Sequence, residues 1–156
     1  MKYVFIAHSH TLLLTNLGVI ENLNLPSKDV IILFTRGYKT SLPLDHRQID
    51  ANKLYDFSFE MVERKKRLSM SRNIKKVDKT LAGWIQDDFC LFVPHLAIPL
   101  FKLMYTNKHC KNVSFVQEGA FLFASHFINK LSWVNKLKGK IKAIIRNGTV
   151  RYYGGL

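Results

Sequence analysis

Three short runs of consecutive apolar residues constrain the fold of this chain most strongly. Residues 2–7, 29–34 and 89–93 are rich in Val, Ile, Leu and Phe, and none of them alternates between polar and apolar positions. A strand that is apolar on both sides must be buried on both sides, as in a parallel sheet covered by helices. The sequence therefore predicts the α/β class and a Rossmann-like, doubly wound parallel sheet.

The segments between these runs carry apolar residues at helical spacing. One predicted helix follows His8-Ser9-His10 and is closed by Pro26, and its apolar positions are Leu12, Leu13, Leu17, Ile20 and Leu23. A basic helix is predicted over residues 60–86, where an apolar stripe recurs every three or four residues. The stripe consists of Ile74, Val77, Leu81 and Ile85, with Lys75, Lys76 and Lys79 on the opposite side.

The remaining elements complete the expected sheet. Residues 54–59 predict the third strand, and residues 113–117 predict the fifth. A helix is expected over residues 96–106, where Pro99 is compatible only with the first turn. The pattern predicts one Rossmann-like domain over residues 1–128, followed by a basic amphipathic tail over residues 129–156.

The tail is expected to form a helix over residues 133–146, with apolar residues on one side and cations around the rest. Such a helix either lies on an anionic membrane surface or packs on the domain with a solvated basic face. Both arrangements fit the pattern.

The charge of the chain predicts attraction to polyanions. It has 24 Lys and Arg against 11 Asp and Glu, which gives a formal net charge of +13. Nucleic acid, anionic lipid head groups and phosphorylated or acidic sugars all fit this balance. Cys90 and Cys110 lack a metal-like spacing and are expected to be reduced. No signal peptide or membrane-spanning run is recognisable, so we expect a cytoplasmic protein, peripheral at the inner membrane face.

Polar residues follow the ends of the predicted strands. Because parallel strands end at one edge of a sheet, we expect these residues to converge there. They are His8, Ser9, His10, Arg36, Pro94, His95, Gln117, Glu118 and Gly119. We expect the substrate to be bound by six of them: His8, Ser9, His10, His95, Gln117 and Gly119. The alternative for the histidines is that they occupy ordinary loop positions. His8 and His10 without a third ligand make a poor zinc site, so no metal is expected.

Glu118 is the most distinctive of these residues. It is the one carboxylate after Asp88, in a stretch of 68 residues with ten Lys and Arg. Nearby positive charge is expected to lower the pKa of Glu118 and keep the carboxylate ionised. A low pKa makes this carboxylate a weak base at rest, so burial on substrate binding would have to raise its pKa if Glu118 acts as a general base. A solvated Glu or one paired with Lys is the alternative. Dinucleotide, Walker and serine hydrolase motifs are absent.

Three runs in the second half have a recognisable layout, and they read DFCLFVPH from Asp88, PLFKLMYTNK from Pro99 and NVSFVQEG from Asn112. This layout resembles the N-terminal domain of bacterial lipooligosaccharide sialyltransferases (glycosyltransferase family 52) and of the related bacterial polysialyltransferases. In that family a strand ends in two acidic residues and a glycine, and the second acid activates the acceptor hydroxyl. The resemblance implies that Glu118 is this base, with Gln117 in place of the first acid.

The resemblance also implies a wider architecture. Its members are similar to GT-B enzymes, in which the N-terminal half presents a glycan acceptor and the C-terminal half binds a CMP-sugar donor. The family's His-Pro motif, which helps to hold the donor phosphate, does not occur in this sequence. We therefore expect the acceptor half of such an enzyme in lipooligosaccharide or capsule synthesis, inactive without a donor-binding domain and needing no other cofactor. The alternative is a basic module that binds nucleic acid or a membrane surface without catalysis.

Overall fold

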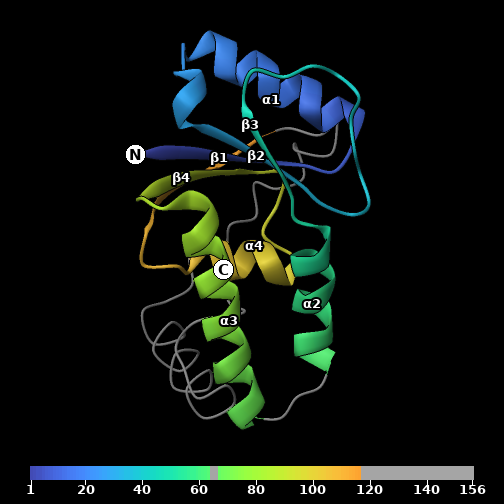
Figure 1. The fold of residues 1–156 in the computed structure, drawn as a ribbon, viewed down its shortest axis with the longest axis vertical. Helices are drawn as coiled ribbons and strands as arrows, with labels where there is room; N and C mark the ends of the chain where they lie inside the picture. The colour runs from blue at the N-terminus through green and yellow to red at the C-terminus, as the bar shows by residue number, and fades with distance from the viewer. Residues whose placement is uncertain (64–66, 117–156) are drawn as a thin grey trace, which may run out of the picture.

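The computed structural model describes residues 1–63 and 67–116, and these form a five-stranded parallel sheet with helices on both faces (Figure 1). The strand order is β3-β2-β1-β4-β5, and every neighbouring pair is parallel. The strands are β1 (Lys2–Ala7), β2 (Val30–Phe34), β3 (Arg47–Asp50), β4 (Phe89–Val93) and β5 (Cys110–Phe115). The predicted Rossmann-like α/β class with a parallel sheet is confirmed.

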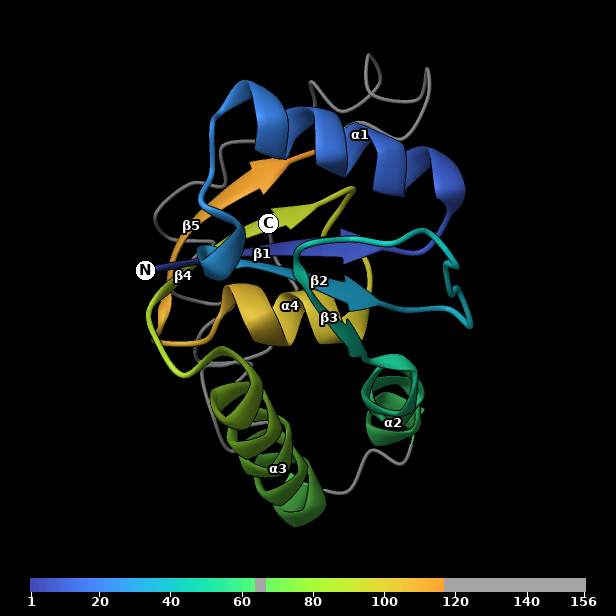
Figure 2. The same ribbon diagram turned by 45° about the horizontal axis from the view of Figure 1, so that its top comes forward.

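The helices cover the two faces unequally. Helix α1 (His10–Asn22) lies on one face, whereas α2 (Asn52–Glu63), α3 (Arg67–Ile85) and α4 (Pro99–Tyr105) lie on the other (Figures 1 and 2). A short 3₁₀ turn, Ser27–Asp29, leads into β2. Pro99 occupies the first turn of α4, as predicted, because a proline there loses no helical hydrogen bond.

Alternate residues of the central strands supply two apolar layers. Phe5 and Phe92 stack beneath α1 with ring centroids 4.2 Å apart, while Val4 and Leu91 point toward the other three helices. The central strands are almost wholly buried, which explains why their sequences carry no polar alternation. Asn16 anchors α1, since its Nδ2 donates a hydrogen bond to the carbonyl of Ile6 at 2.8 Å.

The predicted third strand is wrong. Residues 54–59 lie inside α2, where Leu54, Ser58 and Met61 are buried, and Ala51 is buried immediately before the helix begins. These positions are three or four residues apart, so burial follows the helical period across the whole segment. The actual third strand is β3, a four-residue edge strand with the sequence RQID and mostly exposed side chains.

Other boundaries differ more modestly. The basic helix predicted over residues 60–86 corresponds to the end of α2 and to α3, with residues 64–66 outside the described part. Its apolar stripe is buried as predicted. Strand β5 begins at Cys110 and ends at Phe115, whereas residues 113–117 were expected. The tail, its predicted helix and the domain boundary at 128 lie outside the described residues.

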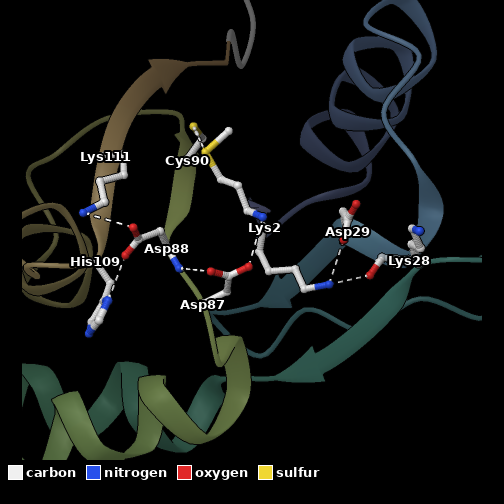
Figure 3. A network of polar contacts seen from close by, with 9 residues as sticks. Lys2, Lys28, Asp29, Asp87, Asp88, Cys90, His109 and Lys111 are labelled. Carbon is white, nitrogen blue, oxygen red and sulfur yellow. Dashed lines mark hydrogen bonds and ion pairs between the residues drawn. The ribbon is translucent and has the colours of Figure 1, made fainter.

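Polar contacts tie together the amino ends of the strands, at the edge where the strands begin (Figure 3). The ammonium group of Lys2 lies 2.8 Å from the carboxylate of Asp29 and thereby links β1 to the turn before β2. Asp88 pairs with His109 at 2.9 Å and with Lys111 at 3.1 Å, which links β4 to β5. Hydrogen bonds from His109, and then from Lys111, hold the pKa of Asp88 below its usual range.

Replacing Asp88 with Asn is expected to lower the free energy of unfolding at neutral pH. A carboxylate with a lowered folded-state pKa stabilises the fold above its unfolded pKa of about 3.9, and this contribution disappears as pH falls through the folded pKa. The difference between Asp88→Asn and the unmodified chain should therefore shrink below about pH 4. Urea unfolding at a series of pH values measures it. The exposed Asp45 gives a matched control, Asp45→Asn, and an equal loss there would contradict the assignment.

Cys90 and Cys110 are free thiols in the half-buried edge of the core. Burial, and then the neighbouring Cys90, raises the pKa of Cys110 to about 11, so this thiol stays protonated at neutral pH.

Within the described ranges, no helix has both the length and the apolar character to cross a membrane.

Candidate functional site

The strand order creates a switch point between β1 and β4. From β1 the chain continues into α1 on one face, and from β4 it continues toward α4 on the opposite face. In open α/β sheets ligands bind in the crevice that such a divergence leaves beyond the carboxyl ends of the strands. We call this edge, where all five strands end, the carboxyl edge.

Two predicted segments flank this switch point. The register of the sheet pairs Phe5 of β1 with Phe92 of β4, and His8 and His95 each come three residues further along. Neighbouring strands are about 4.8 Å apart, so the two segments leave the sheet side by side. The predicted convergence at the carboxyl edge is met for residues 8–10 and 94–95.

His10 is held by a residue that sequence reasoning did not single out. Its Nδ1 lies 2.9 Å from the hydroxyl of Tyr38, and the two rings meet edge to face at 5.1 Å. Tyr38 in turn contacts Phe34 at the end of β2, with ring centroids 5.7 Å apart. This contact fixes one ring nitrogen of an exposed imidazole and leaves Nε2 for other partners.

A strained turn places Tyr38 there. Arg36 and Gly37 both have positive φ angles, 58° and 74°, and the amide of Gly37 donates to Oδ1 of Asn52 at 2.6 Å. Asn52 is itself held by Asp50 at the end of β3. A glycine such as Gly37 is typical of a turn, but no local sequence pattern indicates that this turn brings Tyr38 to His10.

Replacing Tyr38 with Phe is expected to release His10 while retaining the ring contact with Phe34. The lost hydrogen bond should cost about 1 kcal/mol or less in the free energy of unfolding, because the pair is exposed. The imidazole resonances of His10 should move in histidine-selective NMR spectra, while those of His109 at the amino ends of the strands stay fixed. Unchanged His10 resonances would show that the Tyr38 contact is absent in solution.

Ser9 has a local structural role. Its Oγ accepts a hydrogen bond from the amide of Leu12 at 3.2 Å, and its extended backbone makes it the N-cap of α1. Ser is among the residues that stabilise a helix N-terminus most effectively. A direct contact of Ser9 with substrate stays a prediction.

His95 lies in the short connection from β4 to α4. Its Nδ1 accepts a hydrogen bond from the amide of Ala97 at 3.3 Å, and its ring lies 5.9 Å from that of Phe101. A neutral imidazole whose Nδ1 is an acceptor carries its proton on Nε2. His95 is therefore arranged as a hydrogen-bond donor through Nε2.

The principal catalytic candidate, Glu118, lies outside the described residues together with Gln117 and Gly119. The structure describes the chain as far as Val116, whose amide donates to the carbonyl of Val93 at 2.9 Å. This bond continues the pairing of β5 with β4 at the carboxyl edge. The described chain thus stops one residue short of Gln117, beside the end of β4.

A cleft of about 850 Å³ lies at the opposite edge, between the second half of α3 and the connection from α4 to β5. Its acidic groups are already engaged: Asp78 accepts a hydrogen bond from Asn107, and Asp87 lies 3.0 Å from the terminal amino group. None of the predicted site residues that the structure describes lines it.

Metal ligands do not cluster in the described residues, where no three His, Cys, Asp or Glu side chains are placed to hold an ion.

Comparison with known proteins gives no relative: no family model, curated protein or solved structure matches the chain. Inference about function therefore depends on the carboxyl edge and on the sequence that follows it.

Proposed function

We propose that this chain is the acceptor-binding half of a sialyltransferase-like glycosyltransferase of GT-B architecture, acting in lipooligosaccharide or capsule glycan synthesis. Glu118 is the general base of the reaction. His8, Ser9, His10, His95, Gln117 and Gly119 form the acceptor site. The donor is a CMP-sugar held by a second domain.

The observation that carries the proposal is the switch point between β1 and β4. The imidazoles of His10 and His95 have one nitrogen engaged by Tyr38 and by the amide of Ala97, respectively. Nε2 of the exposed His10 ring can then bond a sugar hydroxyl, and His95 follows β4 at the same carboxyl edge. The pairing of Val116 with Val93 brings the described chain to the carboxyl edge immediately before Gln117.

Sugar transfer by direct displacement requires a group that accepts the proton of the attacking hydroxyl. In direct displacement, the acceptor hydroxyl attacks the anomeric carbon of the donor sugar, and cytidine monophosphate leaves as the new glycosidic bond forms. Glu118 takes the hydroxyl proton in this step. The phosphate that leaves is already a good leaving group, so the mechanism calls for no metal in the acceptor half.

Acceptor binding by this chain is expected to be visible at its histidines. Titrating histidine-labelled protein with galactose-terminated oligosaccharide should shift the imidazole signals of His10 and His95. His109, at the opposite edge, serves as an internal control and should not move. Mannose gives a second control, since it lacks the acceptor's terminal galactose. No shift at either carboxyl-edge histidine, or an equal shift at His109, would refute an acceptor site there.

A further inference from the structure

Helix α3 has only basic residues among the exposed charged side chains of its residues 70–85. Its exposed charged side chains are Arg72, Lys75, Lys76 and Lys79, which we call the α3 cation face. At 100° per residue these positions lie opposite the buried stripe that includes Ile74, Val77 and Leu81. The face spans eight residues, from Arg72 to Lys79, or about 10 Å along the helix axis.

The α3 cation face is not neutralised by carboxylates in the described part of the chain. No ion pair joins any of its four cations to an acid there. Asp78, on the flank of α3, accepts a hydrogen bond from Asn107. The ammonium group of Lys76 lies over the ring of Phe57, 4.8 Å from its centre.

The whole sequence has few carboxylates that could neutralise the α3 cation face. Its 11 carboxylates face 24 Lys and Arg residues. Among the described acids, Asp29, Asp87 and Asp88 are already occupied at the amino ends of the strands. The α3 cation face therefore presents a concentrated positive charge that suits an extended anionic surface.

We propose that the α3 cation face docks the protein on a membrane surface that contains anionic lipid. Clusters of four or more Lys and Arg on one helix face are typical of binding to acidic head groups. Three of the four residues are lysines, whose compact charge needs no shaped partner. This contact is separate from acceptor binding at the carboxyl edge.

Nucleic acid fits the face less well. Binding of single strands uses aromatic side chains on which bases stack, and the one aromatic residue of α3, Trp84, packs against the core. Sequence-specific binding of duplex DNA needs side chains that read base edges, commonly bidentate Arg or Asn. The α3 cation face has one Arg and otherwise only Lys, so it offers charge without stacking or base reading.

Binding to vesicles tests the proposal. The complete chain should co-sediment with vesicles of phosphatidylcholine and phosphatidylserine at low salt, and should not do so with phosphatidylcholine alone. The triple variant Arg72→Gln, Lys75→Gln, Lys79→Gln should bind roughly a hundredfold more weakly, because each cation near an anionic surface strengthens binding about fivefold. Circular dichroism checks that the variant is folded.

Two control variants distinguish the contribution of the α3 cation face to vesicle binding from the contributions of total net charge and of the tail. Lys28→Gln, Lys39→Gln, Lys108→Gln removes three exposed cations that are spread over other elements, and it should retain binding within a few-fold. Lys136→Gln, Lys138→Gln, Lys140→Gln removes three cations of the tail. The proposal is overturned if either control loses as much affinity as the α3 variant. It is equally overturned if duplex DNA is bound while the vesicles are not.

Discussion

Replacing Glu118 with Gln is expected to lower the rate of sugar transfer by about 10²- to 10⁴-fold, the range for loss of a general base. The amide is nearly the same size as the carboxylate, but it cannot accept the proton of the attacking hydroxyl. The measurement is transfer from CMP-sialic acid to galactose-terminated lipooligosaccharide by the native protein together with its donor-binding domain. Binding of the acceptor should change little.

The matched control is Glu21→Gln, which makes the same substitution at an exposed position of α1. It should leave transfer unchanged. The pH profile gives a second readout, because the rate of the unmodified protein should fall as the Glu118 carboxylate becomes protonated at acid pH, and the variant should lack this limb. Full transfer activity in Glu118→Gln would show that another group is the base, even if acceptor binding at His10 and His95 holds.

Replacing Phe5 with Ala is expected to lower the free energy of unfolding by about 3–5 kcal/mol. Phe5 lies in the central strand with no exposed surface, and its ring stacks on Phe92 at 4.2 Å. Truncation removes the buried ring and leaves a cavity beneath α1 that the rigid sheet cannot close. Urea or thermal unfolding measures the loss, which is a large fraction of the stability of a typical domain.

Phe115→Ala is the corresponding control in β5, the strand at the end of the sheet. Phe115 is 52% exposed, so the same truncation should cost less than about 1 kcal/mol. The contrast depends on burial alone, because the amino acid and the secondary structure are the same at both positions. Equal losses at Phe5 and Phe115 would contradict the packing described for the central strands.

The sequence predicts the buried strands well, for a physical reason. β1, β2 and β4 lie inside the sheet, and burial on both faces forces nearly every residue to be apolar. β3 lies at the end of the sheet and has no such requirement, so its polar sequence carries no strand signal. Residues 54–59 contain Tyr and Phe, which favour strands, and only the longer spacing from Ala51 to Met61 shows the helix.

The candidate site also has one part that the sequence predicts and one part that it does not. Positions after buried strands follow from the topology, which is why His8, His10 and His95 were placed at one edge. Tyr38 could not be predicted, because its contact with His10 joins residues 28 apart through a turn whose shape depends on Asn52. Hydrogen bonds across a connection of this kind depend on tertiary geometry and leave no periodic pattern in the sequence.

The central position of β1 has a consequence for synthesis of the protein. β1 is the first strand to be made, yet one of its two neighbours is β4, and the register that pairs Lys2 with Phe89 joins residues 89 − 2 = 87 apart. At translation rates of about 5–20 residues per second, β1 waits roughly 4–17 s for this partner. During that interval one side of an apolar strand lacks its neighbour. Chaperones that shield nascent chains should therefore bind this protein until the ribosome has released β4.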